Sequence, residues 1–311
     1  TKVPAKLAQD LARTASRAQR IWVEARAEND FARFAPALSE MLDLRRQEAQ
    51  ALAGAEGNVY DALLDAYEPG ATGESLSAMF GAMRPRLVAL REAVLARPEP
   101  EGLSGTFPSG KQMRLGKKIA RGFGYDFDRG RLDIAVHPFS SGSGDDVRIT
   151  TRTDESDPFN CLYSTIHEVG HATYEQNIDP AYQLSPLGCG VSMGVHESQS
   201  RIYENQLGRS EAYTGYVFSQ MQQVFGAAGI GDARAFYRAV NRVRKGYIRT
   251  EADEVQYNLH VLLRFDLERA LISGDLQVAD LETAWNDRFA ADFGYEVDKP
   301  ANGVLQDVHW S

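Results

Sequence analysis

Apolar residues recur at helical spacing along most of the chain, and this periodicity predicts a mainly helical protein. Among the first 125 residues, the predicted helices cover residues 5–27, 31–53, 59–67, 72–96 and 111–123. Pro85 is expected to interrupt the fourth of them, because proline lacks the N–H that an interior helical position donates. In the second half of the chain, the predicted helices cover residues 157–177, 195–208, 210–228, 232–245, 250–273 and 278–293.

Two short runs rich in β-branched residues, 132–139 and 146–152, depart from the helical pattern. Serines and glycines fill residues 140–145 between them, which is typical of a turn that joins paired strands. We therefore expect a small antiparallel β-sheet directly before the helix at 157–177. The predicted fold class is mainly α with this sheet inserted.

Composition narrows the class of protein without identifying it. With 43% hydrophobic and 25% charged residues, the chain has the composition of a soluble globular protein. Its net charge of −9 argues against a nucleic-acid partner. We expect no membrane association and a cytoplasmic location, because no apolar run reaches membrane-spanning length and no signal peptide is recognisable. Two cysteines, Cys161 and Cys189, do not make a disulfide framework.

The most informative residues are His167, Glu168 and His171, which form the pattern H-E-x-x-H. Residues four apart lie on one face of a helix, so the two imidazoles can bind the same metal ion. Glu168 lies next to the first histidine, where a carboxylate can reach a metal-bound water without being a ligand. The pattern therefore predicts zinc with a general base beside it.

A catalytic zinc site needs a third protein ligand, and spacing leaves three acids as candidates. Glu197 is the first choice, because it begins a helix after a glycine-rich loop and can fold back across the histidine pair. Glu204 and Glu175 compete with it. Glu175 lies four residues after His171 on the same helix face, so it could instead orient that histidine.

Other polar clusters have ordinary explanations when each is considered alone. His137 and Arg148 belong to the two predicted strands, where an extended peptide could add as a further strand. The acids that follow Arg249 suit a helix N-terminus, although Arg249 itself has no obvious structural duty. The segment that contains His309 is polar and aromatic, which is unusual for a C-terminal segment without a function.

Taken in order, these clusters resemble the motifs of the carboxypeptidase Taq family of metallocarboxypeptidases. The resemblance runs from about Ala5 to the last residues and rests on six motifs: His137-Pro-Phe139, Asp146-x-Arg-x-Thr150, His167-Glu-x-x-His171, His196-Glu-Ser-Gln199, Ile248-Arg-Thr-x-Ala-Asp-Glu254 and Gly303-x-x-Gln-Asp-x-His-Trp310. It implies a helical zinc-peptidase fold with a deep groove, a homodimer, and removal of single residues from peptide C-termini. It also implies that family segments are missing at both ends.

The resemblance assigns His167, His171 and Glu197 as metal ligands and Glu168 as the base. We expect one catalytic domain, 1–311, with a helical scaffold at 1–125 and the sheet and metal-binding helices at 126–311. In the expected reaction, Glu168 takes a proton from zinc-activated water, and His309 helps to hold the oxyanion.

A carboxypeptidase must also bind the free C-terminal carboxylate of its peptide substrate, which a guanidinium does with two hydrogen bonds. Arg249 is the first choice for this role, Arg148 the second, and His137 assists. Cobalt or another divalent ion could replace zinc, since two nitrogens and one oxygen accept several metals. The alternatives are an endopeptidase or aminopeptidase on the same site, or a helical binding module with a non-catalytic metal.

Overall fold

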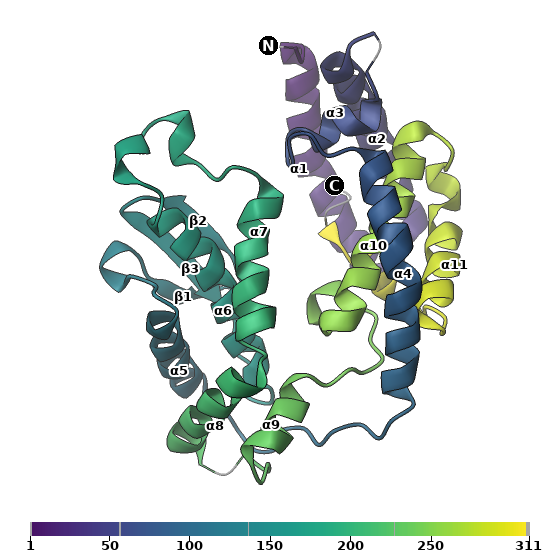
Figure 1. Cartoon of the computed structure of the whole chain (residues 1–311). Coiled ribbons are helices and arrows are strands. Elements are labelled where there is room, and N and C mark those ends of the chain that lie inside the picture. Colours follow the sequence, from purple (N-terminus) through teal and green to yellow (C-terminus); the bar gives the residue numbers. More distant parts are fainter. Residues whose placement is uncertain (1, 56, 136, 227, 309–311) are drawn as a thin grey trace. The chain divides into compact units, whose positions relative to one another are not determined.

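The computed structural model describes residues 2–55, 57–135, 137–226 and 228–308, and they are mainly helical (Figure 1). The helices are α1 (Ala5–Glu28), α2 (Phe31–Ala53), α3 (Val59–Leu64), α4 (Gly73–Leu95), α5 (Ser109–Gly122), α6 (Pro158–Gln176), α7 (Met193–Arg201), α8 (Glu211–Phe225), α9 (Ala233–Val240), α10 (Glu254–Ser273) and α11 (Leu281–Phe293). The strands are β1 (Leu132–Ile134), β2 (Ser140–Ser143) and β3 (Asp146–Thr151). The predicted fold class, mainly helical with a small sheet, is confirmed.

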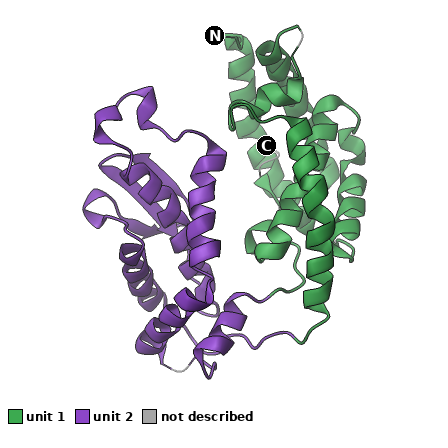
Figure 2. Ribbon diagram, viewed as in Figure 1, with its two compact units in different colours: residues 1–98, 243–311 green, residues 99–242 purple. Residues whose placement is uncertain are grey.

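The chain divides into two compact units (Figure 2). Unit 1 combines the two ends of the chain, Thr1–Pro98 and Val243–Ser311, and unit 2 is the central segment Glu99–Arg242. This division differs from the expected boundary near residue 125, while the single catalytic domain and the deep groove stay predictions. Among the described helices, none combines the length and the apolar content needed to cross a membrane.

Unit 1 is a helical assembly with its own apolar core. Asp30 accepts a hydrogen bond from the backbone N–H of Arg33, so α2 begins where the cap-type residue predicts. The helices bury large apolar side chains against one another, among them Phe34, Leu38, Leu259, Leu263, Trp285 and Phe289. Burial of these side chains is the main source of stability for a helix assembly of this kind.

The predicted interruption of α4 at Pro85 is wrong, because the helix continues from Gly73 to Leu95. The preceding residue, Arg84, forms ion pairs with Asp266 of α10 and Asp292 of α11. Asp292 is buried, so these contacts attach the middle of α4 firmly to its neighbours. Tertiary packing therefore offsets the hydrogen bond that the proline cannot make.

In unit 2, the helix α6 is the central element, and it packs against α5, α7 and the sheet. Strand β3 alternates between exposed and buried side chains over its first residues, and Val147 and Ile149 point into the core with Val169 and Ala172 of α6. The predicted position of the sheet beside the His-containing helix is confirmed.

The sheet is mixed rather than wholly antiparallel, and its strand order is β1-β3-β2. Residues 140–143, which we expected in the turn, form β2 and pair antiparallel with β3. The turn is reduced to Gly144 and Asp145, and Gly144 has a φ of 59°, which favours glycine. Strand β1 lies parallel on the other side of β3.

Candidate metal centre

His167 and His171 lie on one face of α6, as the i,i+4 spacing predicts. The helix begins at Pro158, where Asp157 accepts a hydrogen bond from the N–H of Phe159. The centroids of the two imidazole rings are 4.9 Å apart. Both side chains are largely buried, with relative exposures of 21% and 19%. The local sequence is therefore enough to form the paired arrangement.

Glu197 of α7 faces both imidazoles from the neighbouring helix. Its Oε2 lies 3.1 Å from Nε2 of His171 and 3.7 Å from Nε2 of His167. One ligand atom from each of the three residues can be chosen so that all lie within 4.8 Å of one another. Two imidazole nitrogens and one carboxylate oxygen at this separation can hold a divalent cation.

The close approach of α6 and α7 depends on Gly170. A Cβ atom at this position would lie 2.4 Å from Cα and 2.9 Å from the backbone N of Ser200. Gln199 secures the same contact, because its Nε2 donates hydrogen bonds of 2.9 Å to the Gly170 carbonyl and to Oγ1 of Thr173. The glycine between the two histidines thus lets the helix that carries Glu197 approach the site.

The second nitrogen of His167 is held by Glu204, whose Oε2 lies 3.0 Å from Nδ1. Glu204 lies in a π-helical turn, Ile202–Leu207, that continues α7. Arg209 and Arg201 approach its carboxylate within 3.2 Å and 3.5 Å. Glu204 therefore pairs with Nδ1 of His167, whereas Glu197 is the acid grouped with the two histidines as a candidate ligand.

His171 is held through a second imidazole. Its Nδ1 lies 2.7 Å from Nδ1 of His196, and Nε2 of His196 lies 2.8 Å from Oε1 of Glu175. The sequence placed Glu175 near His171 as an orienting group, but the structure inserts His196 between them. The sequence shows only that His196 directly precedes Glu197, and ligand spacing along the chain does not predict its contact with His171.

These partners determine which nitrogen of each imidazole ring carries the proton. An ionised carboxylate only accepts hydrogen bonds, so Nδ1 of His167 donates to Glu204, and Nε2 of His196 donates to Glu175. Nδ1 of His196 then accepts from Nδ1 of His171. Both candidate ligand histidines are left with an Nε2 lone pair on the side of Glu197, where a cation would satisfy all three acceptors together.

Glu168 is buried on α6, with a relative exposure of 7%. Burial is the main reason that the pKa of Glu168 is raised to about 7. The negative charges of Glu197 and Glu204 also raise this pKa, whereas the nearby His167 lowers it. Burial also opposes ionisation of Glu204, but the hydrogen bond from His167 and the charge of Arg209 lower the pKa of Glu204 to about 2. The pKa values of these two acids, Glu168 and Glu204, are thus shifted in opposite directions.

The residues predicted to bind the peptide carboxylate have different surroundings. Arg148 is exposed on β3 and forms a two-bond pair with Asp146, at 2.8 and 2.9 Å. His137 is exposed, and its carbonyl accepts a hydrogen bond of 3.3 Å from Oγ1 of Thr150. His309 lies outside the described residues.

Arg249 belongs to unit 1 and has structural partners there. Its Nε and Nη2 donate to the two carboxylate oxygens of Asp307, at 3.2 and 3.1 Å, and its Nη1 donates to the Tyr257 hydroxyl at 3.1 Å. Its backbone N–H donates to Gln306 at 2.9 Å. Arg249 therefore holds the C-terminal segment, a duty that the sequence did not indicate, and its role toward substrate stays a prediction.

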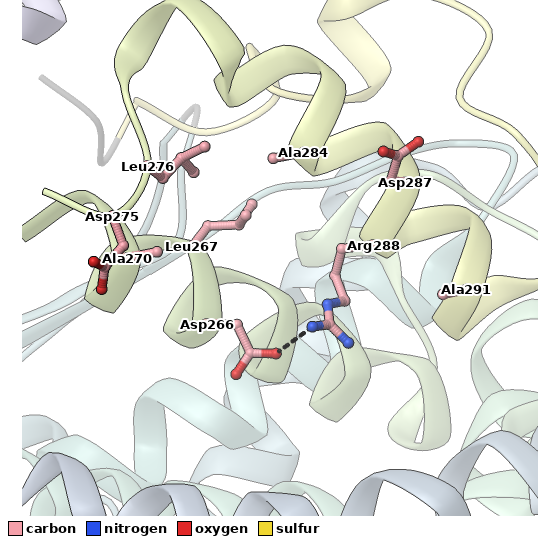
Figure 3. A pocket seen from close by; sticks show the side chains of 9 residues that line it. All are labelled: Asp266, Leu267, Ala270, Asp275, Leu276, Ala284, Asp287, Arg288 and Ala291. Carbon is pink, nitrogen blue, oxygen red and sulfur yellow. Dashed lines mark ion pairs between the residues drawn. The ribbon is translucent and has the colours of Figure 1, made fainter. Parts of the chain in front are cut away.

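A pocket on the surface of unit 1 contains none of the predicted site residues (Figure 3). It lies between α10 and α11, and Asp266 forms an ion pair of 3.5 Å with Arg288 in its wall. The remaining lining residues are Leu267, Ala270, Asp275, Leu276, Ala284, Asp287 and Ala291. This pocket therefore adds no residue to the candidate metal site of unit 2.

The chain is similar to known proteins along its described length. The family model described as carboxypeptidase Taq (M32) metallopeptidase matches residues 1–311. Carboxypeptidase 1 of Bacillus subtilis is 37% identical over 100% of this chain and 63% of its own length. Thermostable carboxypeptidase 1 of Thermus thermophilus is 40% identical over 99% of the chain and 63% of its own length.

Solved structures show the same similarity. The M32 carboxypeptidase from Deinococcus radiodurans R1 is 42% identical, with a TM-score of 0.96 over 100% of this chain and 63% of that one. Metallocarboxypeptidase 1 of Trypanosoma cruzi is 36% identical, with a TM-score of 0.93 over 100% of this chain and 64% of that one. The chain thus spans a little under two thirds of the length of these relatives.

Proposed function

Because the chain belongs to the carboxypeptidase Taq (M32) family of metallopeptidases, we propose that it carries the metal centre of a carboxypeptidase that releases single amino acids from peptide C-termini. The observation that carries this proposal is the convergence of His167, His171 and Glu197, with Glu168 buried beside them. The partner is then a peptide with a free C-terminus. We also propose a cytoplasmic homodimer, and the net charge of −9 disfavours nucleic acid as a partner.

His167 and His171 would hold a divalent cation through Nε2, and Glu197 would hold it through its carboxylate. Zinc suits this donor set, and cobalt or another divalent ion is compatible with it. When bound, the cation supplies Lewis acidity that polarises a peptide carbonyl and acidifies water. Glu204 and His196 contact the Nδ1 atoms of His167 and His171, and both Nε2 atoms lie toward Glu197.

Glu168 is the proposed general base. A pKa of about 7 lets Glu168 take a proton from the attacking water near neutral pH and then give it to the leaving amine. Glu168 is therefore assigned proton transfer and not metal binding.

Arg249, Arg148 and His137 stay the proposed contacts for the terminal carboxylate, and His309 stays the proposed oxyanion donor. Support for the arginines comes from the geometry of a guanidinium, which binds a carboxylate through two hydrogen bonds. Arg249 and Arg148 each already make such a pair, with Asp307 and Asp146. Substrate binding through either one would need this pair to open or to be shared.

The decisive test separates metal binding from proton transfer. Glu168→Gln should leave the metal content of the purified chain unchanged and lower kcat by at least about 100-fold, the usual contribution of a general base. Glu211→Gln makes the same chemical change at an exposed residue of α8 and should leave both unchanged. Unchanged turnover in Glu168→Gln would refute the mechanism.

The reaction class is tested with two peptides of one sequence, one blocked at its N-terminus and the other amidated at its C-terminus. Stepwise cleavage of only the first, from its C-terminus, supports the proposal. Cleavage within the peptide indicates an endopeptidase. Cleavage of only the amidated peptide, from its N-terminus, indicates an aminopeptidase. Metal binding with no cleavage of either peptide would favour a binding module.

A further inference from the structure

The hydrogen bond between Glu204 and His167 lies on the side of the imidazole opposite the proposed metal. Nε2 of His167 faces Glu197, whereas Nδ1 meets Oε2 of Glu204 at 3.0 Å. A ring whose Nδ1 is unpaired can exchange its proton between the two nitrogens and turn about its χ angles. A carboxylate on Nδ1 prevents both, because it accepts a hydrogen bond only from the protonated nitrogen.

Glu204 is itself fixed by other side chains. Arg209 lies 3.2 Å from Oε1 of Glu204, donates to the Val240 carbonyl at 2.9 Å, and has its guanidinium carbon 4.1 Å from the centre of the Tyr163 ring. Arg201 lies 3.5 Å from Oε2. Two guanidinium groups and the His167 imidazole therefore hold one carboxylate, which is more support than an incidental surface acid receives.

The backbone of this segment is also specialised. Residues Ile202–Leu207 form a π-helical turn, in which the N–H of Gly208 bonds to the Tyr203 carbonyl five residues earlier, at 2.8 Å. Isolated π-turns within α-helices are rare and frequently occur at functional sites. Glu197 and Glu204 thus come from one continuous helical segment, and they reach opposite nitrogens of the same imidazole.

We infer that Glu204 is a positioning residue for the metal centre, which holds His167 with Nδ1 as donor and Nε2 free for the cation. This inference rests on the proposed function, since it takes His167 as a ligand. His171 receives separate support from His196 and Glu175, so loss of Glu204 releases only one of the two imidazoles. Partial loss of metal affinity is therefore expected, and complete loss is not.

The test compares the affinity for zinc of the wild-type chain, Glu204→Gln and the control Glu211→Gln, measured by competition with a chelator. Removal of a group that orients a metal-binding histidine typically weakens metal affinity by about 10- to 100-fold. We expect this loss in Glu204→Gln only, with its metal-free far-UV circular dichroism unchanged. A variant that folds and binds zinc as tightly as wild type would overturn the inference.

Two further results keep the inference distinct from the proposed function. A wild-type chain that binds no zinc would refute the proposed function, and this inference with it. If Glu204→Gln does not fold, nitrogen-15 NMR of the metal-free wild-type chain, at a pH where the His167 imidazole is neutral, decides, with the His167 signals assigned by their loss in His167→Gln. A proton on Nδ1 supports the inference, and a proton on Nε2 overturns it.

Discussion

Gly170→Ala should weaken metal binding by about 100-fold while leaving the four chemical groups of the site unchanged. The added Cβ would lie 2.4 Å from Cα of Ser200, about 1 Å closer than ordinary van der Waals contact. Both of the closest atoms belong to the backbone of Ser200, so no rotation of a side chain relieves the overlap. Helix α7 must therefore move away from α6 by roughly 1 Å.

Glu197 moves with α7, because it lies three residues before Ser200 on the same helix. Its present separation from Nε2 of His171 is 3.1 Å, and metal–ligand distances tolerate only about 0.2 Å of error. A misplacement of about 1 Å can cost about 100-fold at a functional site, which corresponds to about 2.7 kcal/mol. The unfolding free energy should change less, because overpacking costs about 1–3 kcal/mol and alanine regains about 1 kcal/mol of helix propensity.

The assay measures zinc affinity by chelator competition and the stability of the metal-free chain by denaturant unfolding. Gly215→Ala is the matched control, because a Cβ at this position in α8 would meet no atom within 4 Å. It should leave zinc affinity unchanged and raise stability by up to about 1 kcal/mol. If Gly170→Ala is folded and retains wild-type zinc affinity, the contact at Ser200 does not position Glu197.

Three other expectations follow from the structure of unit 1. Arg84→Met leaves Asp292 buried without its ion-pair partner and should lower the unfolding free energy, measured with denaturant, by about 3–5 kcal/mol. The control Arg17→Met breaks an exposed ion pair and should lower it by at most about 1 kcal/mol, so similar losses in the two variants would contradict this expectation. Burial and nearby arginines lower the pKa of His260 to about 3 from its usual 6.5, so the folded chain resists a proton that the unfolded chain accepts. Its contribution to stability is complete above pH 6.5 and falls by up to about 1.4 kcal/mol per pH unit down to about pH 3, and His260→Gln should flatten this part of the pH profile. Arg249→Ala should raise KM for free-acid peptides far more than it raises the inhibition constant of amidated peptides, and equal effects would show that its pair with Asp307 is purely structural.

Local sequence determined the features that depend on neighbours along the chain. The i,i+4 spacing placed His167 and His171 on one helix face, and Asp30 and Asp157 mark the starts of α2 and α6. Helical periodicity likewise predicted the mainly α class. Each of these depends on backbone geometry over one or two turns, which a short stretch of residues specifies by itself.

Only the tertiary structure decided which distant groups meet. Spacing left Glu197, Glu204 and Glu175 as competing ligands, and the approach of α7 at Gly170 brought Glu197 to Nε2 and Glu204 to Nδ1. Packing likewise carried α4 through its proline and set β1 parallel to β3. These outcomes depend on contacts between segments far apart in the chain, whose energies no local pattern contains, so the face of a helix can be read from sequence but its partner cannot.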